Sequence, residues 1–492
     1  VPYASCSGVG RRWRSPGPVL PWTGVREAAQ WGPVAPQSPP TPGLSIPGDP
    51  LTSDEDCLNL NVWTPGIDDA QRPVLVWVHG GGFTTGTGAS ALFRGERLAR
   101  RGDMVVVTIN YRLGALGFLA HEALRDGLTS GCGNWGLLDQ LAALEWVQDH
   151  IATFGGDPGN VTLFGESAGA MSICALLASD ACGRSFHKAV LQSGPPVSAG
   201  IAWAEERAER LAQLAGSSTF GREQMLGLTS DTLVEATRRL ASEAPHAEGL
   251  PLPLLPVVDG ALLGRPPAEA VADGMAARVP LLVGTNRDEA ALFITTDPAA
   301  QEIDIGRVIR RVARVTSPES APRVVEAYRS ARLERGEPVG ERDLLTAIVG
   351  DYVFRLPSLA FAEAAHKHQP KTFVYLFTWE SPFLGGIFGS SHGLDIPFVF
   401  GTVEDERIAP FAGSGPEASA LSLAMQDAWV AFAHTGDPSS EAVGEWPAYD
   451  PLRRPTMQLG RVTALVEDPR SPERRAWDET EADFGVGHHH DV

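Results

Sequence analysis

The sequence has few cysteines, and they are not grouped as metal ligands. None of the five forms a Cys-x-x-Cys pair or has a histidine neighbour at zinc spacing. We therefore expect no metal site and interpret them as mostly free thiols of a reducing, cytoplasmic compartment. Because residue 1 is Val and not Met, a removed leader stays an open alternative. The cysteines are Cys6, Cys57, Cys132, Cys174 and Cys182.

Positive charge is also scarce. The chain has 40 lysines and arginines against 60 aspartates and glutamates, a formal net charge of −20. Nucleic acids and anionic membranes attract clustered basic residues, so this balance argues against both as partners. No run approaches the ~20 consecutive apolar residues of a membrane helix. We expect a soluble protein that acts on an uncharged or cationic small molecule, and the sequence leaves its oligomeric state undefined.

Internal repeats and long linkers are absent, and 43% of the 492 residues are hydrophobic, enough for one large core. Apolar runs typical of buried parallel strands alternate with longer amphipathic segments. This order predicts an α/β fold with a large, mostly parallel central sheet flanked by helices. We expect one domain over residues 1–492, with helical insertions near the site at about 200–275 and 300–365. The predicted strands are residues 74–78, 104–108, 161–164, 189–191, 280–283 and 372–377.

A Gly-x-Ser-x-Gly turn at residues 165–169 is the strongest chemical signal. It stands between the predicted strand 161–164 and an apolar, helix-forming run. A sharp strand-to-helix turn exposes the serine hydroxyl for attack on a carbonyl carbon. The sequence therefore predicts Ser167 as a nucleophile, and the amide of Ala168, at the helix start, as a donor to the developing negative charge.

A glycine run follows the first strong strand, in the sequence His-Gly-Gly-Gly-Phe at residues 79–83. Glycine backbones can approach an oxyanion closely because no Cβ intervenes. A phosphate-binding loop is the alternative, but no Gly-Lys-Ser/Thr follows. Its position in the chain favours an oxyanion loop.

The base and the acid that would assist Ser167 are less well defined by pattern. Asp288 and Glu289 both follow the predicted strand 280–283, and spacing alone does not choose between them. His392 lies in a Gly- and Ser-rich loop after the last strong strand, where catalytic groups are often held. The chain has 12 histidines, and those at 366, 368 and 488–490 are interpreted as helix-end or tail residues.

Residues 154–169 match the serine signature of the type-B carboxylesterase family, and the chain resembles this family over essentially its whole length. The resemblance implies an α/β-hydrolase fold, Glu289 as the acid and His392 as the base. It implies oxyanion donors in the amides of Gly81, Gly82 and Ala168, and buried polar neighbours of the histidine in Glu166 and Ser193. It also implies ion pairs Arg112–Asp139 and Arg12–Glu55. The other matching motifs are residues 55–62, 110–114, 133–140, 192–194, 284–289, 392–401, 435–438 and 446–450.

The chain departs from the family pattern at three places. Ala35 replaces the cysteine that usually pairs with Cys57, which fits a reducing compartment. The chain begins at what resembles an Ile-Pro-Tyr-Ala element, so an N-terminal hairpin is expected to be missing. No aromatic residue lies between Gln37 and Glu55, where cholinesterases carry a choline-binding Trp. The resemblance is therefore closer to bacterial esterases of the para-nitrobenzyl esterase type.

Together these features predict a serine carboxylesterase that hydrolyses neutral esters, with short to medium acyl chains, through an acyl-enzyme on Ser167 and without a cofactor. A lipase or an amide hydrolase is the alternative, because both use the same triad chemistry. A non-catalytic, esterase-like binding module is disfavoured because Ser167, Glu289 and His392 are all present.

Overall fold

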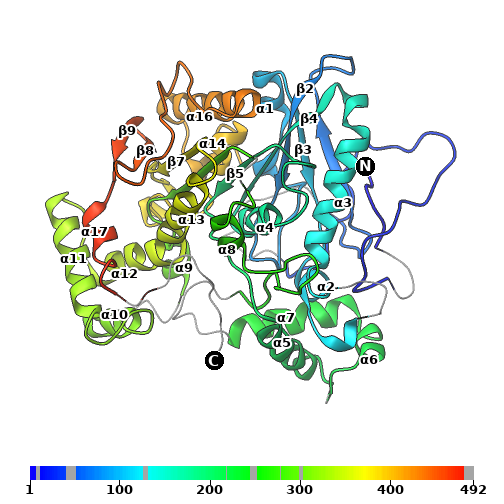
Figure 1. Cartoon of the computed structure of the whole chain (residues 1–492), viewed down its shortest axis with the longest axis horizontal. Helices are drawn as coiled ribbons and strands as arrows, with labels where there is room; N and C mark the ends of the chain where they lie inside the picture. Colours follow the sequence, from blue (N-terminus) through cyan, green and yellow to red (C-terminus); the bar gives the residue numbers. More distant parts are fainter. Residues whose placement is uncertain are drawn as a thin grey trace.

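A computed structural model of the chain describes residues 1–6, 11–39, 51–125, 131–217, 219–243, 252–276, 279–297, 303–480 and 482. Within these residues the centre of the molecule is a nine-stranded sheet of order β1-β3-β2-β4-β5-β6-β7-β8-β9 (Figure 1). The strands are β1 (Leu60–Trp63), β2 (Arg72–Val78), β3 (Val105–Ile109), β4 (Gly156–Glu166), β5 (Lys188–Gln192), β6 (Leu281–Asn286), β7 (Thr372–Phe377), β8 (Pro455–Leu459) and β9 (Ala464–Glu467).

The middle of the sheet is parallel and its two edges are antiparallel. Neighbouring strands from β3 to β8 in this order run parallel, whereas β1 pairs antiparallel with β3 and β9 pairs antiparallel with β8. The six strands predicted from apolar runs are β2 to β7, so the α/β prediction is confirmed. The prediction missed β1, β8 and β9. In β9 intermediate and exposed residues alternate, so it carries no continuous apolar run.

Both faces of the sheet are covered by helices (Figure 1). Val74, Val76 and Val78 of β2 belong to one hydrophobic cluster, and Leu75 and Trp77 belong to the cluster on the other face. This alternation explains why the central strands are apolar throughout. The helices around these strands are α1 (Glu96–Gly102), α2 (Gly114–Phe118), α3 (Trp135–His150), α4 (Ala168–Leu177), α14 (Ile396–Phe400), α15 (Ala409–Ala412) and α16 (Pro416–Thr435), and α17 (Ser471–Arg475) follows β9 in the chain.

Two helical segments interrupt the alternation of strands and helices. Between β5 and β6 lie α5 (Ile201–Leu214), α6 (Arg222–Leu226), α7 (Ser230–Glu243) and α8 (Pro267–Ala272). Between β6 and β7 lie α9 (Ala291–Thr296), α10 (Ile305–Val312), α11 (Ala321–Glu334), α12 (Glu341–Gly350) and α13 (Leu356–His366). Helices α10, α11 and α12 pack around a third hydrophobic cluster, at the lower left of Figure 1.

Helices α12 and α13 form one long apolar helical run. Helices α12 and α13 join through a π-turn into the run Glu341–His366, which among the described helices is the one long and apolar enough to cross a membrane. In its most apolar window 72% of the residues are buried inside the fold. An internal helix of a folded domain has this same character.

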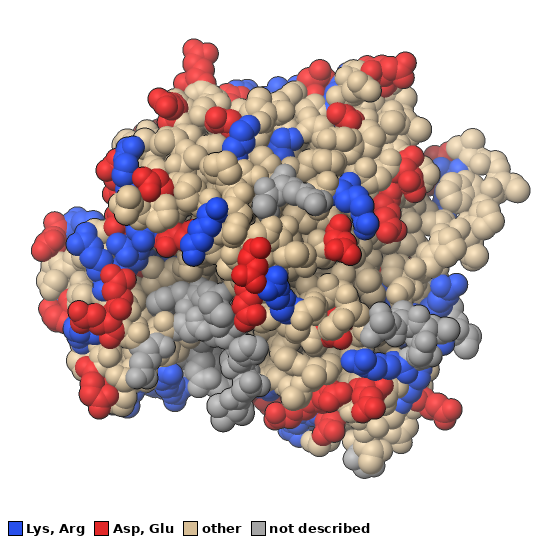
Figure 2. Space-filling view, viewed as in Figure 1, with Lys and Arg blue, Asp and Glu red and all other residues tan. Residues whose placement is uncertain are grey.

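Charged side chains are interspersed on the face of the molecule seen in Figure 2. Acidic and basic residues alternate over this face, and most basic side chains there have an acidic neighbour. One ion pair between elements joins Arg101 of α1 to Asp427 of α16 at 2.7 Å.

Both ion pairs implied by the resemblance are present. The Arg112 guanidinium donates to Asp139 at 2.6 and 2.7 Å, and both side chains are buried. This pair joins the loop after β3 to α3. Arg12 pairs with Glu55 and also donates to the carbonyl of Leu228 at 2.6 Å, so it ties the N-terminal segment to the loop before α7.

Loss of Arg112 should destabilise the fold, because Asp139 would keep a buried charge without a partner. We expect Arg112→Leu to lower the apparent free energy of unfolding by about 3–5 kcal/mol. Arg210→Leu is the matched control, because its pair with Glu243 is exposed and should leave the transition unchanged. Guanidinium denaturation followed by tryptophan fluorescence measures both. Equal midpoints for the two variants would contradict the role of the buried pair.

Candidate active site

Ser167 occupies the turn between β4 and α4 in a conformation that few residues adopt. Its backbone has φ 54° and ψ −128°, and such a strained position costs about 1–3 kcal/mol. The turn is tight because a Cβ at Gly169 would lie 2.0 Å from the carbonyl oxygen of Val78. Glycine is therefore required there, and the sharp reversal directs Ser167 away from the strand axis, as the Gly-x-Ser-x-Gly pattern predicts.

The glycine loop after β2 lies against this serine. A Cβ at Gly80 would come within 2.9 Å of the Ser167 Cβ, so only a glycine allows this approach. Gly81 and Gly82 follow with φ of 113° and 60°. Among the described residues, none accepts a hydrogen bond from the amides of Gly81, Gly82 or Ala168. Gly80 thus lies against the serine, and the amides of Gly81 and Gly82, which follow it, and of Ala168, which follows Ser167, have no acceptor among the described residues.

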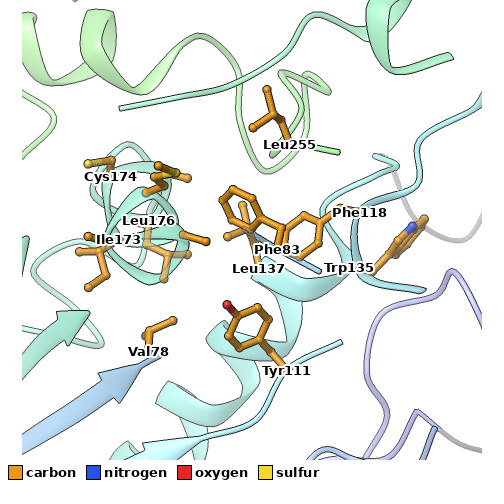
Figure 3. Packing of buried hydrophobic residues seen from close by; sticks show 14 of the residues in the cluster. Val78, Phe83, Tyr111, Phe118, Trp135, Leu137, Ile173, Cys174, Leu176 and Leu255 are labelled. Carbon is orange, nitrogen blue, oxygen red and sulfur yellow. The ribbon is translucent and has the colours of Figure 1, made fainter. Parts of the chain in front are cut away.

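Phe83 anchors the glycine loop in the core. Its side chain is fully buried and its ring contacts that of Phe118 with centroids 4.8 Å apart. Figure 3 shows Phe83 beside Phe118, with Leu255 above the two rings and Tyr111 below them. The Phe83 carbonyl also accepts a 2.7 Å hydrogen bond from the Gly114 amide. This packing holds the loop in place before any ligand binds.

The structure brings Glu289 and His392 together. His392 Nδ1 lies 2.7 Å from Glu289 Oε2, and both side chains are buried. Asp288 faces elsewhere, because its carboxylate accepts from Arg287 at 2.6 Å and from the Ser390 amide at 2.9 Å. Of the two carboxylates that spacing left open, only Glu289 contacts the imidazole.

A second carboxylate contacts the other side of the imidazole. Glu166 Oε1 lies 3.1 Å from His392 Nε2. Among the described residues, Ser167 Oγ makes no hydrogen bond to His392, whose Nε2 faces Glu166. Such contacts often tighten only when substrate binds. The hydroxyl of Ser193, the other expected polar neighbour, is buried and finds no hydrogen-bond partner among the described residues.

Burial and the neighbouring carboxyl groups act in opposite directions on the histidine. Burial lowers the pKa of His392, but Glu166, Glu289 and Asp395 raise it, and the pKa reaches about 9. Burial likewise raises the pKa of Glu166 to about 8, although the charge of His392 lowers it. The neighbouring carboxyl groups thus outweigh burial, and the imidazole is a stronger base than a free histidine.

Several residues around the histidine were not predicted from the sequence. The rings of Phe354 and Phe293 lie with centroids 4.7 and 5.4 Å from the imidazole and form an apolar wall. Asn286 and Asp395 contribute buried polar contacts next to Glu289 and Ser391. Both lie inside motifs that the sequence analysis recognised, whereas no pattern marks the two phenylalanines.

The remaining candidates lie elsewhere or outside the described residues. His366 ends α13, and His368 Nε2 contacts the carbonyl of Ala272 at 2.8 Å. The histidines at 488–490 lie outside the described residues. No three His, Cys, Asp or Glu side chains are grouped as metal ligands within the part of the chain that the structure describes.

Comparison with known proteins places this site in a family. A model of the carboxylesterase family matches residues 1–477. The chain belongs to the carboxylesterase family. It is 36% identical over 481 residues to para-nitrobenzyl esterase of Bacillus subtilis (strain 168), covering 96% of this chain and 93% of that protein. It is 36% identical over 458 residues to phenmedipham hydrolase of Pseudarthrobacter oxydans, covering 91% and 88%.

The solved structures agree with this assignment. A structure of PNB esterase matches with a TM-score of 0.84 at 34% identity, covering 97% of this chain and 94% of that one. The expected α/β-hydrolase fold, and the expected membership in the family, are confirmed. This carboxylesterase is accordingly a hydrolase of carboxylic esters, and its substrates are small ester molecules.

The raised pKa of His392 predicts where the acid limb of the pH profile lies. Because only the neutral imidazole can accept the serine proton, kcat/KM for a neutral ester should rise with pH through about 9 and level off above it. Glu166→Gln removes a charge that raises this pKa and should move the limb to lower pH. Glu467→Gln, on the edge strand β9, should leave it in place. A limb near the free-histidine value of about 6.5 that Glu166→Gln does not move would contradict the assignment.

Proposed function

We propose that this carboxylesterase hydrolyses neutral esters through an acyl-enzyme on Ser167, with His392 as general base and Glu289 as the acid that orients it. The observation that carries the proposal is the buried 2.7 Å contact between His392 Nδ1 and Glu289 Oε2 beside the strained serine turn. A carboxylate on Nδ1 fixes the tautomer that leaves Nε2 free to accept a proton.

The proposed reaction has two balanced steps. His392 Nε2 takes the hydroxyl proton while Ser167 Oγ bonds to the ester carbonyl carbon, and the carbonyl oxygen becomes negative. The bond to the alkoxy group then breaks, and the alcohol leaves with the proton from His392. Water repeats the sequence on the acyl-enzyme and releases the carboxylic acid. Nε2 lies 3.1 Å from Glu166 Oε1 in the free enzyme, and we propose that it turns to Ser167 Oγ when substrate binds.

The oxyanion is proposed to bind the amides of Gly81, Gly82 and Ala168. Each such donor contributes roughly 3 kcal/mol to the transition state when it is aimed at the developing charge. Support comes from the close approach of the glycine loop to Ser167 and from the lack of described acceptors for these three amides. The buried Phe83 keeps two of the donors fixed, so little reorganisation is needed during the reaction.

Replacing each of the two neighbouring carboxylates by its amide, in separate variants, tests the triad. Glu289→Gln should lower kcat by about 10³–10⁴, approaching the residual rate of Ser167→Ala, because the imidazole loses its orienting charge. Asp288→Asn should lower kcat far less, because Asp288 contacts Arg287 and Ser390 and not the imidazole. Steady-state hydrolysis of para-nitrophenyl acetate measures all three variants. A larger loss in Asp288→Asn than in Glu289→Gln would exchange the two roles.

The substrate class is proposed to be soluble esters with short or medium acyl chains. Phe293 and Phe354 form an apolar wall beside His392 that suits a neutral acyl group, and the net charge of −20 disfavours anionic substrates and lipid surfaces. We expect butyrate esters in solution to be hydrolysed with a kcat/KM at least about a hundredfold above that of the matching anilides, since amides are the harder acyl donors. Emulsified long-chain triglycerides should react more slowly than butyrate esters. A triglyceride hydrolysis rate that rises sharply once the substrate exceeds its solubility and forms an emulsion would favour a lipase instead.

We also propose that the protein works in the cytoplasm. All five cysteines are free thiols and all are buried. Thiols persist as such in compartments where the glutathione and thioredoxin systems keep them reduced. The absence of the usual partner of Cys57, at Ala35, supports the same compartment.

A further inference from the structure

The proposed acid and base come from two loops that no secondary structure joins directly. Glu289 lies three residues beyond the end of β6, and His392 lies in the loop before α14. A 2.7 Å contact between them requires that the two loops keep a fixed relative position. A residue that contacts both loops would supply this position.

Asn286, the last residue of β6, makes both contacts. Its backbone amide donates to Glu289 Oε1 at 2.7 Å, and its side-chain Nδ2 donates to the carbonyl oxygen of Ser391 at 2.7 Å. Ser391 immediately precedes His392. The side chain of Asn286 is buried, so water does not compete for these hydrogen bonds. One residue thus holds the carboxylate of the proposed acid and the backbone next to the proposed base.

Asp395 sets the direction of the Asn286 amide. Its Oδ1 lies 3.4 Å from Asn286 Nδ2, and its Oδ2 accepts from Gln192 Nε2 at 2.8 Å and from the Tyr375 hydroxyl at 2.9 Å. Asp395 is fully buried and is the N-cap residue of α14. The carboxyl group is therefore held from strands β5 and β7, and it presents one oxygen to the amide of Asn286.

We propose that Asn286 is a positioning residue that keeps Glu289 and His392 in register for the reaction. The inference rests on the proposed triad. It concerns a residue that touches neither the ester nor the reacting atoms and acts through Glu289 and the backbone of Ser391. Without its side chain the Ser391 carbonyl keeps only the 3.2 Å hydrogen bond from the Leu394 amide, which lies in the same loop, and the histidine loop can shift relative to Glu289.

The test compares two asparagines that are both buried and both hydrogen-bonded through their side chains. Asn286→Ala should lower kcat for para-nitrophenyl acetate by about a hundredfold with KM changed less than about twofold, the scale expected when a catalytic group is misplaced by about an ångström. The acid limb of kcat/KM should also move to lower pH, because a looser contact with Glu289 raises the pKa of His392 less. Glu166 and Asp395 still face the imidazole, so the limb should stay above the value of a free histidine. Asn134→Ala is the control, since Asn134 is equally buried and exchanges two 2.8 Å hydrogen bonds with Val257.

Each outcome decides between a positioning and a merely structural role. A thermal midpoint lowered in both variants, with kcat and the acid limb changed only in Asn286→Ala, supports the proposal. Equal kcat and an unmoved limb in both variants overturn it. If Asn286→Ala does not fold, Asn286→Ser, whose side chain is too short to reach Ser391, replaces it in the same comparison. Glu289→Gln is measured alongside. Loss of activity in Glu289→Gln but not in Asn286→Ala overturns this inference alone, whereas full activity in Glu289→Gln overturns the proposed triad as well.

Discussion

The buried contact between His392 and Glu289 joins residues that are 103 positions apart in the chain. Nothing local brings them together, so the contact depends on the pairing of β6 with β7, which aligns Asn286 with Phe377. The loops beyond these strand ends are then tied to each other and to the sheet. Ser390 donates through its hydroxyl to the Phe377 carbonyl at 2.9 Å, and the Asp288 amide donates to the Ser390 carbonyl at 2.9 Å. The pairing of β6 with β7 thus brings the loop that carries Glu289 next to the loop that carries His392.

Charge is the second constraint on this region. Glu166, Glu289 and Asp395 surround one imidazole in a buried volume, and carboxylates so close together cannot all stay ionised without a counter-charge. The positive imidazole offsets part of this charge, and burial together with the charge of Glu289 raises the pKa of Asp395. Asp288 escapes the problem because Arg287 and Arg470 hold its pKa low despite its burial. The two adjacent carboxylates, Asp288 and Glu289, therefore have different partners, since Asp288 pairs with Arg287 and Glu289 contacts His392.

The sequence predicts the parts of this arrangement that follow from local rules. Apolar runs predicted β2 to β7, because strands covered on both faces carry them. They failed for β1 and β9, which are the edge strands, and for β8, which lies next to the edge. The serine turn and the glycine loop were found because each needs glycine for a steric reason at a fixed spacing. Pattern alone could not choose Glu289 over Asp288, since that choice depends on a histidine and an arginine brought in by the fold. The apolar wall of Phe293 and Phe354 escaped prediction for the same reason, because its residues come from α9 and from the π-turn before α13.

Strain at the serine is offset by the sheet that carries it. The hydrogen-bond ladder continues past the strand ends, so that the Ser167 amide donates to the Gln192 carbonyl at 2.9 Å and the Ser193 amide donates to the Gly284 carbonyl at 2.8 Å. Both serines have positive φ, at 54° and 52°, and both lie at the point where a strand ends. The backbone of each serine is strained, and such a conformation persists only where the surrounding structure fixes it. Because Gln192 also reaches Asp395 through its side chain, the same residue supports the backbone of the serine turn and the polar network beside the histidine. The strained turn and the buried carboxyl groups are therefore held by a common element, the end of β5, and a change there would act on both.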